Sequence, residues 1–327
     1  MKFYYFLLLI VSIAFINCKK EPIAPFVPKN ELADFITEKP QIIDLDTLVY
    51  KEIKGKHGTE IHYDRNDFEL SENDKVQLEL IELYDFKEIL YRNIQTLTTD
   101  NKLLETSGVL KIVFTSNGKE IKLKKGAKII VYPPKGRLKD NDIFLSKEDS
   151  LGNISWDITN QNFTRAIVRF NGGITKEIII SNDSISNYNE NTGNDLLGIY
   201  SNSSSNLNNY DFFVIKENSW NWINIDRFIN NTKPVSFKLK DDSNNFSGFQ
   251  VYIKYDSIRS FLSYPRLRDN LDFSNIPILG KTSAIIISEL KNQKYYDIIE
   301  LSENMQAEID LNMKKTTKKQ LKSLFDK

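Results

Sequence analysis

The sequence is poor in the residues that most often bind metals or form covalent cross-links. It contains one cysteine, Cys18, and two histidines, His57 and His62, among 327 residues. A single cysteine excludes a disulfide within the chain, so packed cores must stabilise the folded parts. Zinc would need further ligands in suitable geometry, and although Glu60 and Asp64 carry oxygens near His62, such spacing is common by chance. We therefore interpret both histidines as turn or solvent-facing residues and predict no metal and no cofactor.

An excess of one charge is also missing, as are the common catalytic motifs. Lysine plus arginine number 44, and aspartate plus glutamate also number 44. This balance gives no indication of a nucleic-acid partner. The chain has no Gly-x-Ser-x-Gly elbow, phosphate loop or dinucleotide fingerprint. A catalytic pair of carboxylates cannot be chosen among so many acidic residues. We predict that the protein is not an enzyme, and a hydrolase with an unrecognised acidic site is the least favoured alternative.

The first twenty residues contain the one long apolar run of the chain. Lys2 precedes an uncharged stretch, 3–16, which is short for a membrane span but fits the core of a secretory signal. The run ends at Cys18 and resembles a lipoprotein signal, although Asn17 replaces the usual small residue. The resemblance implies a signal peptide at 1–17 and a lipidated Cys18 that anchors the chain to a membrane. An uncleaved anchor, or an ordinary secretory signal beside a chance cysteine, is the alternative.

The remaining chain divides into two strand-rich parts. Four prolines between positions 22 and 40 indicate an extended segment, so we predict a lipidated N-terminus and tether over 18–43. Short alternating runs such as Val76–Tyr84, separated by turns, predict an N-terminal β-sandwich-like domain over 44–180. The stretch 181–209 is dominated by asparagine and serine, which predicts a polar linker.

The second part, 210–327, is predicted to be a C-terminal β domain with a terminal helix. Thr316 or Thr317 can cap this helix, and Leu321, Leu324 and Phe325 share one of its faces. The predicted fold class is therefore all-β, with two β-sandwich-like domains after a signal and a proline-containing tether, and one short C-terminal helix.

Several short motifs carry a resemblance to a known family. They lie at Gly58–Ile61, Asp67–Phe68, Leu103–Leu110, Lys124–Gly126 and Trp220–Phe228. The first four resemble the N-terminal sandwich of uncharacterised lipoproteins in the Bacteroidota. The last is similar to the Gly-Trp-Ile-Asn-Cys-Asp-Arg-Phe block of their second domain.

The chain departs from that block at two positions. Asn221 stands where the family has glycine, and Ile225 where it often has cysteine. The resemblance implies an outer-membrane lipoprotein that is displayed on the surface or faces the periplasm. It implies no molecular activity.

Aromatic and charged residues near Trp220 are the candidate ligand-binding group. Sugar-binding modules stack aromatic rings on sugar faces, and Trp220 and Trp222 would share one side of a strand. The alternative, which we favour, places this side against a core. Asp226 and Arg227 complete the candidate group, either as ligand contacts or as a fixed ion pair or turn cap.

A second pattern concerns modification. Four short sequences consist of aspartate, then serine or threonine, then an apolar residue, which resembles the O-glycosylation signal of exported Bacteroidota proteins. The residues that would be modified are Thr47, Ser150, Ser184 and Ser257. Sugars there would solvate surface turns.

The function predicted from these features is that of an envelope-anchored lipoprotein with a non-enzymatic structural or interaction role. A surface module that binds glycans or other ligands is the alternative. The expected partners are the membrane, through the lipid on Cys18, and envelope proteins or glycans. Nucleic acid is not expected.

Overall fold

The protein is an all-β molecule, as the sequence predicts. The computed structural model describes residues 25–45, 52–71, 74–134, 141–149, 153–162, 164–171, 174–181, 184–187, 208–216 and 221–326; within 160–212, and at 216, only the strand backbone is described. Strands form most of this part of the chain, and its helices are short. No helix among the described residues is long and apolar enough to cross a membrane.

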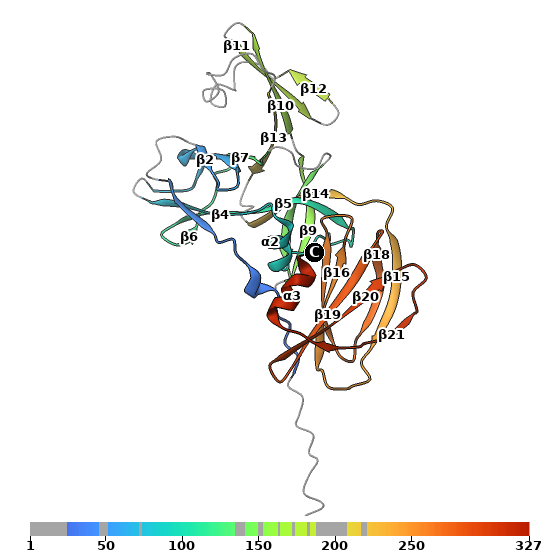
Figure 1. Cartoon of the computed structure of the whole chain (residues 1–327). Helices are drawn as coiled ribbons and strands as arrows, with labels where there is room; N and C mark the ends of the chain where they lie inside the picture. Colours follow the sequence, from blue (N-terminus) through green and yellow to red (C-terminus); the bar gives the residue numbers. More distant parts are fainter. Residues whose placement is uncertain are drawn as a thin grey trace, which may run out of the picture.

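Two seven-stranded sheets form the first sandwich (Figure 1). One sheet has the order β1 (Gln41–Asp44), β4 (Val76–Leu83), β5 (Leu104–Ser116), β14 (Asn221–Phe228), β8 (Asp142–Glu148) and β9 (Ile154–Asn162), with β6 (Lys119–Glu120) beside β5. The other has the order β12 (Ser184–Asn187), β11 (Ile174–Ser181), β10 (Thr164–Asn171), β13 (Asn208–Lys216), β7 (Lys128–Tyr132), β3 (Glu60–His62) and β2 (Glu52–Lys54). Alternate apolar residues of both sheets, such as Leu78 and Val131, fill the space between them.

A second sandwich follows in the chain. Its smaller sheet has the order β18 (Asp272–Ile278), β15 (Lys233–Lys240) and β21 (Glu308–Asp310). Its larger sheet has the order β17 (Phe261–Leu267), β16 (Gly248–Tyr255), β19 (Thr282–Leu290), β20 (Gln293–Leu301) and β22 (Lys314–Lys315). Phe237 and Phe273 are stacked within its core, with ring centroids 4.9 Å apart.

The helices lie mainly where the two sandwiches meet. They are α2 (Phe86–Tyr91), α3 (Lys318–Phe325) and the 3-10 turns η1 (Ala33–Phe35) and η3 (Arg65–Asp67). Thr317 caps α3 and forms a capping box with Gln320, which confirms one of the two predicted caps. The apolar face of α3 contacts a third core that lies between the outer faces of β5 and β16. The two sandwiches are therefore joined by a continuous buried cluster, which we call the joint core.

The boundary between the sandwiches differs from the predicted one. The prediction begins the second domain at 210, but β13 pairs with β7, and β14 pairs with both β5 and β8. Residues up to Phe228 therefore complete the first sandwich. Of the predicted linker, 181–209, the described residues belong to β11, β12 and β13, which with β10 form an excursion that extends the second sheet; 182–183 and 188–207 lie outside the described residues. A polar composition is shared by linkers and by such excursions, so it could not distinguish them.

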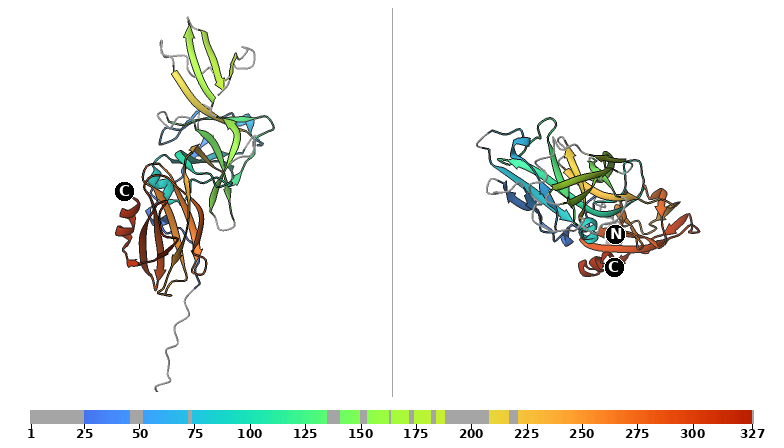
Figure 2. Two further views of the ribbon diagram at one scale, coloured as in Figure 1. Left: turned by 90° about the vertical axis from the view of Figure 1, so that its right-hand side faces the viewer. Right: turned by 90° about the horizontal axis from the view of Figure 1, so that it is seen from above.

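The predicted tether also differs from the structure. From residue 25 the segment runs along the second sandwich, where Phe26 lies over Gly248, and then reaches the joint core. Leu32 and Phe35 are buried there, and β1 pairs with β4. The prolines do favour extended backbone, but the apolar residues between them anchor it. The segment 26–44 therefore connects both sandwiches, which lie one beyond the other with β10 to β12 at the far end (Figure 2).

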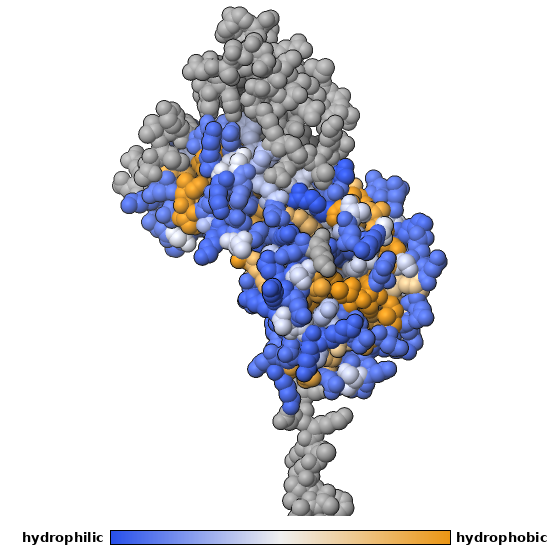
Figure 3. All heavy atoms as spheres, in the orientation of Figure 1, coloured by the Kyte–Doolittle hydropathy of each residue, from blue (hydrophilic) through white to orange (hydrophobic). Residues whose placement is uncertain are grey.

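The surface of the described part is mostly hydrophilic in the view of Figure 3, with larger hydrophobic areas over the second sandwich. The large apolar side chains with the greatest exposure come from separate elements and are Val27, Ile42, Ile158, Leu267 and Ile298. Single exposed apolar residues are normal on folded proteins and do not define a binding patch.

Candidate functional site

The candidate ligand-binding residues that the structure describes lie on β14, in the interior of the first sheet. Trp222 is half-buried and packs against the joint core from β14, a strand of the first sandwich. Trp220 lies outside the described residues. Because Trp222 is half-buried, the structure does not support a row of two exposed tryptophans.

Asp226 and Arg227 do not form a pair with each other. Neighbouring residues of a strand point to opposite faces of the sheet. Arg227 instead pairs with Glu105, the residue opposite it on β5: its Nη2 lies 2.6 Å and its Nε 2.9 Å from Glu105 Oε2. Both nitrogens donate to the same carboxylate oxygen, so the Arg227 side chain is held against the neighbouring strand β5.

Asp226 is buried, with no exposed surface, and belongs to a small polar group. Asn224 Nδ2 donates a hydrogen bond of 2.5 Å to Asp226 Oδ2, and Thr106 Oγ1 donates one of 3.1 Å to Asn224 Oδ1. A β-bulge lies at this point, because Ile225 is opposite Gly108 and Asp226 is opposite Thr106. The bulge turns Thr106 toward the same group, and its Oγ1 also accepts the Gly108 N–H.

Burial raises the pKa of the Asp226 carboxyl to about 8, against the opposing effects of Thr106, Asn224 and the charge of Arg259. Its Oδ1 makes no hydrogen bond to any described residue. Asp142 lies opposite Asp226 on β8, and burial raises its pKa too. Asp226 is therefore predominantly neutral near pH 7, and since solvent cannot reach it, it is not placed to act on a substrate.

The Asp226 group lies where a loop of the second sandwich meets the first. The backbone N–H of Thr106 donates to the carbonyl of Arg259 at 3.0 Å, and Arg259 Nη2 donates to the carbonyl of Tyr84 at 2.8 Å. Next to this contact, the hydroxyls of Thr96 and Ser260 are 2.7 Å apart and buried. These hydrogen bonds fix the register between the sandwiches, which apolar packing alone would specify less sharply.

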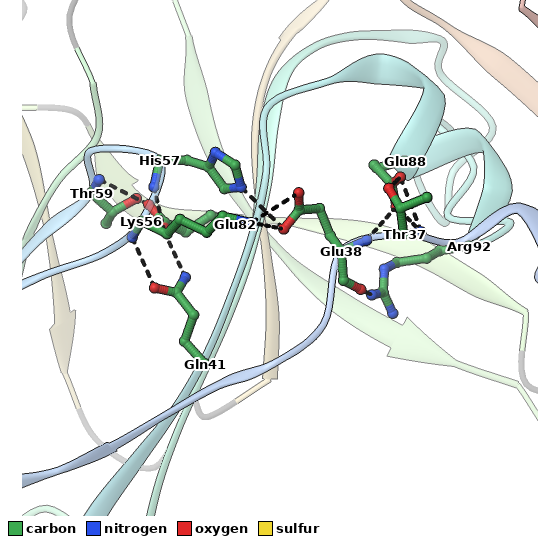
Figure 4. A network of polar contacts seen from close by, with 9 residues as sticks. All are labelled: Thr37, Glu38, Gln41, Lys56, His57, Thr59, Glu82, Glu88 and Arg92. Carbon is green, nitrogen blue, oxygen red and sulfur yellow. Dashed lines mark hydrogen bonds and ion pairs between the residues drawn. The ribbon is translucent and has the colours of Figure 1, made fainter.

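A second polar group is centred on Glu82, a buried residue of β4 (Figure 4). Glu82 Oε1 accepts the Thr59 N–H at 2.9 Å, and Oε2 accepts the His57 N–H at 2.9 Å and Gln41 Nε2 at 2.8 Å. Gly55 allows this close approach, because a Cβ there would lie 2.4 Å from a Glu82 oxygen. The carboxylate thus holds the turn between β2 and β3 against the first sheet.

The same network continues to Glu88 of α2. Glu88 accepts the backbone N–H groups of Thr37 and Glu38 at 3.2 Å each, and the Thr37 hydroxyl also donates to it. Arg92 donates to the Glu38 carbonyl. His57 Nε2 lies 3.1 Å from Glu38 Oε2, and this contact lowers the pKa of Glu38. The donors and acceptors in Figure 4 face one another, so the network connects the N-terminal segment to the first sandwich.

A third polar group could hold a metal ion. Glu52, Glu60 and His62, on β2 and β3, each place one ligand atom within 4.8 Å of the others. His62 is buried, which lowers its pKa. Sequence reasoning considered His62 with Glu60 but missed Glu52, because Glu52 reaches them only through the pairing of the two strands.

The predicted modification sites are only partly described. Cys18, Thr47 and Ser150 lie outside the described residues. Ser184 begins β12, and its side chain is not described. Ser257 is exposed in the bend between β16 and β17, which is compatible with a surface attachment.

Comparison of the chain with protein-family models, with curated proteins and with solved structures found no match. The resemblance to Bacteroidota lipoproteins, and the outer-membrane location that it implies, therefore remain predictions.

Proposed function

We propose that the protein is an envelope-anchored lipoprotein with a non-enzymatic structural or interaction role. The observation that carries the proposal is how the polar residues are used. Glu82 and Glu88 are buried, and their hydrogen bonds bind distant parts of the chain to each other. Asp226 is also buried, and its described hydrogen bond comes from Asn224 on the same strand. This use favours a rigid display scaffold over a catalytic or sugar-binding site. The half-buried position of Trp222 in the joint core weighs against the glycan-binding alternative.

The short distance between Cys18 and the folded part suggests how such a scaffold would stand on a membrane. Pro25 lies seven positions after Cys18, and an extended chain of seven residue steps spans at most about 25 Å. Since the segment from residue 25 runs along the second sandwich, that sandwich would lie near the membrane. Strands β10 to β12 would then project away from it, toward partners in the envelope or outside (Figure 1).

Membrane fractionation with a lipid label tests this proposal. The wild-type chain, expressed in a bacterium that processes lipoproteins, is expected to incorporate an alkyne-tagged fatty acid and to sediment with membranes. Cys18→Ser should abolish the label and leave the chain unprocessed or in the soluble fraction. Ser302→Ala, a change of an exposed serine just after β20, is the matched control and should behave like the wild type. A wild-type chain without label, fractionating like Cys18→Ser, would contradict the anchor.

A further inference from the structure

The hairpin of β2 and β3 gathers three potential metal ligands on one face. Glu52 is directly opposite His62, and Glu60 precedes His62 by two residues on the same strand. Because side chains alternate along a strand, all three point to the same side. Their neighbours Ile53 and Ile61 point to the other side, into the core of the first sandwich, where both are buried. The hairpin register, which the core fixes, therefore determines this arrangement of ligands.

The three ligands form a shallow site with a buried base. His62 is 7% exposed, and the centroid of its ring lies 4.9 Å from the ring centroid of Tyr132 on β7. The side chains of Glu52 and Glu60 are 19% and 32% exposed, so they form a rim that an ion can reach from solvent. A tetrahedral zinc ion needs its ligand atoms about 3.4 Å apart, since its bonds are about 2.0–2.2 Å. The ligand atoms lie within 4.8 Å of one another, so binding would require them to approach by at most about 1.4 Å.

A lysine now occupies the solvent side of the site. Lys54 Nζ lies 3.4 Å from Glu52 Oε1 and 3.5 Å from Glu60 Oε1, between the two carboxylates. Its side chain is 69% exposed. An exposed ammonium is held only weakly by such contacts and keeps most of its hydration. It can therefore leave when a divalent cation binds in its place.

We propose that Glu52, Glu60 and His62 bind a Zn²⁺ ion. One imidazole nitrogen and two carboxylate oxygens are ligand types that zinc uses, and three protein ligands leave one position for water. The imidazole disfavours Mg²⁺ and Ca²⁺, which prefer oxygen ligands alone. Since β2 is the edge strand of its sheet, the ion would fasten this edge to β3. The proposal is independent of the membrane anchor.

Calorimetric titration of the full-length chain in detergent with ZnSO₄ tests this site. The chain carries Cys18→Ser so that its thiol cannot bind zinc. We expect the starting chain to bind one Zn²⁺ per chain. The affinity for Zn²⁺ should be at least tenfold lower in His62→Gln. It should be unchanged in His57→Gln, the matched control in which the other histidine is removed. Lys54→Met should bind at least threefold more tightly, because it removes the competing ammonium.

The melting temperature supplies a second measurement on the same variants. Zinc should raise it in the starting chain and in Lys54→Met, but not in His62→Gln. Equal zinc affinity in the starting chain and in His62→Gln would overturn the proposal. A loss of zinc binding in His57→Gln would overturn it too. Should His62→Gln fail to fold, Lys54→Met still decides: unchanged or weaker binding in that variant excludes the site.

Discussion

At the scale of single residues, Asp226 combines two properties that rarely occur together. It is an acidic side chain without exposed surface, and it lies at the contact between two sandwiches. A buried carboxyl costs much less free energy when it is neutral than when it is ionised. Burial is the main cause of its raised pKa: Thr106, Asn224 and the charge of Arg259 lower the pKa, the charge of Glu105 raises it, and burial outweighs them. The folded state therefore favours the protonated form.

This preference predicts that Asp226 makes stability depend on pH. Its pKa is about 8 in the folded chain against 3.8 as the ordinary value. Between these values the unfolded chain releases a proton that the folded chain retains, so the stability present below about pH 4 is lost as the pH rises toward 8. The loss is on the order of 5 kcal/mol for a group so deeply buried. Asp226→Asn should remove this dependence and be more stable than the wild type at pH 8.

Urea unfolding at pH 5, 6.5 and 8, monitored by circular dichroism, measures this difference. The wild-type midpoint should fall relative to that of Asp226→Asn with each step in pH. Asp269→Asn, at an exposed turn of the second sandwich, is the control and should follow the wild type. Parallel pH profiles for wild type and Asp226→Asn would mean that Asp226 is already ionised when folded.

At the scale of elements, β14 determines how the two halves of the chain depend on each other. It lies between β5 and β8, so the first sandwich is incomplete without residues that follow the polar stretch 188–207. A protease site replacing 198–204 should therefore give two fragments that remain associated after cleavage. The measurement is native size-exclusion chromatography of the cleaved protein, with urea as the control that separates the fragments. Fragments that separate without denaturant would instead identify this stretch as a linker between independent domains.

Local signals predicted elements well, because each depends on residues close in sequence. The pair Asn117-Gly118 is a local signal for a hairpin turn, and both residues have positive φ between β5 and β6. Thr317 caps the predicted terminal helix. The alternation from Val76 places Leu78 and Leu80 in the core as expected. The all-β class follows from the sum of such signals.

Long-range partners could not be predicted in the same way. The strand that contains Trp222 pairs with residues more than a hundred positions earlier, and nothing in its own sequence specifies that choice. The same holds for Arg227 with Glu105, and for Glu82 with a turn 23 residues away. The proposed metal ligands were not predicted: Glu60 and His62 are two residues apart, which the sequence alone could not distinguish from chance spacing, and Glu52 joins them only through the hairpin register.

At the scale of the whole molecule, the joint core makes the two sandwiches one buried structure. It contains buried residues from the first sandwich, such as Leu83 and Trp156, from the second, such as Tyr252 and Ile287, and from helix α3. Separating the sandwiches would expose this apolar surface and break the hydrogen bonds around Arg259 and Ser260. We therefore expect both sandwiches to unfold in a single transition.

The positions of the tryptophans allow a direct test of this coupling. All three, Trp156, Trp220 and Trp222, precede the second sandwich in the chain. Trp156 lies in the joint core and Trp222 packs against it, so tryptophan fluorescence reports on the first sandwich and on its contact with the second. Phe273→Ala removes a ring from the core of the second sandwich, which should cost about 3–5 kcal/mol. If the sandwiches are coupled, this change lowers the urea midpoint of tryptophan fluorescence as much as that of circular dichroism. The exposed change Ile298→Ala, in the same sandwich, should shift neither by much. A fluorescence midpoint that stays at the wild-type value in Phe273→Ala would show that the first sandwich unfolds independently, and the joint core would then be only a weak contact.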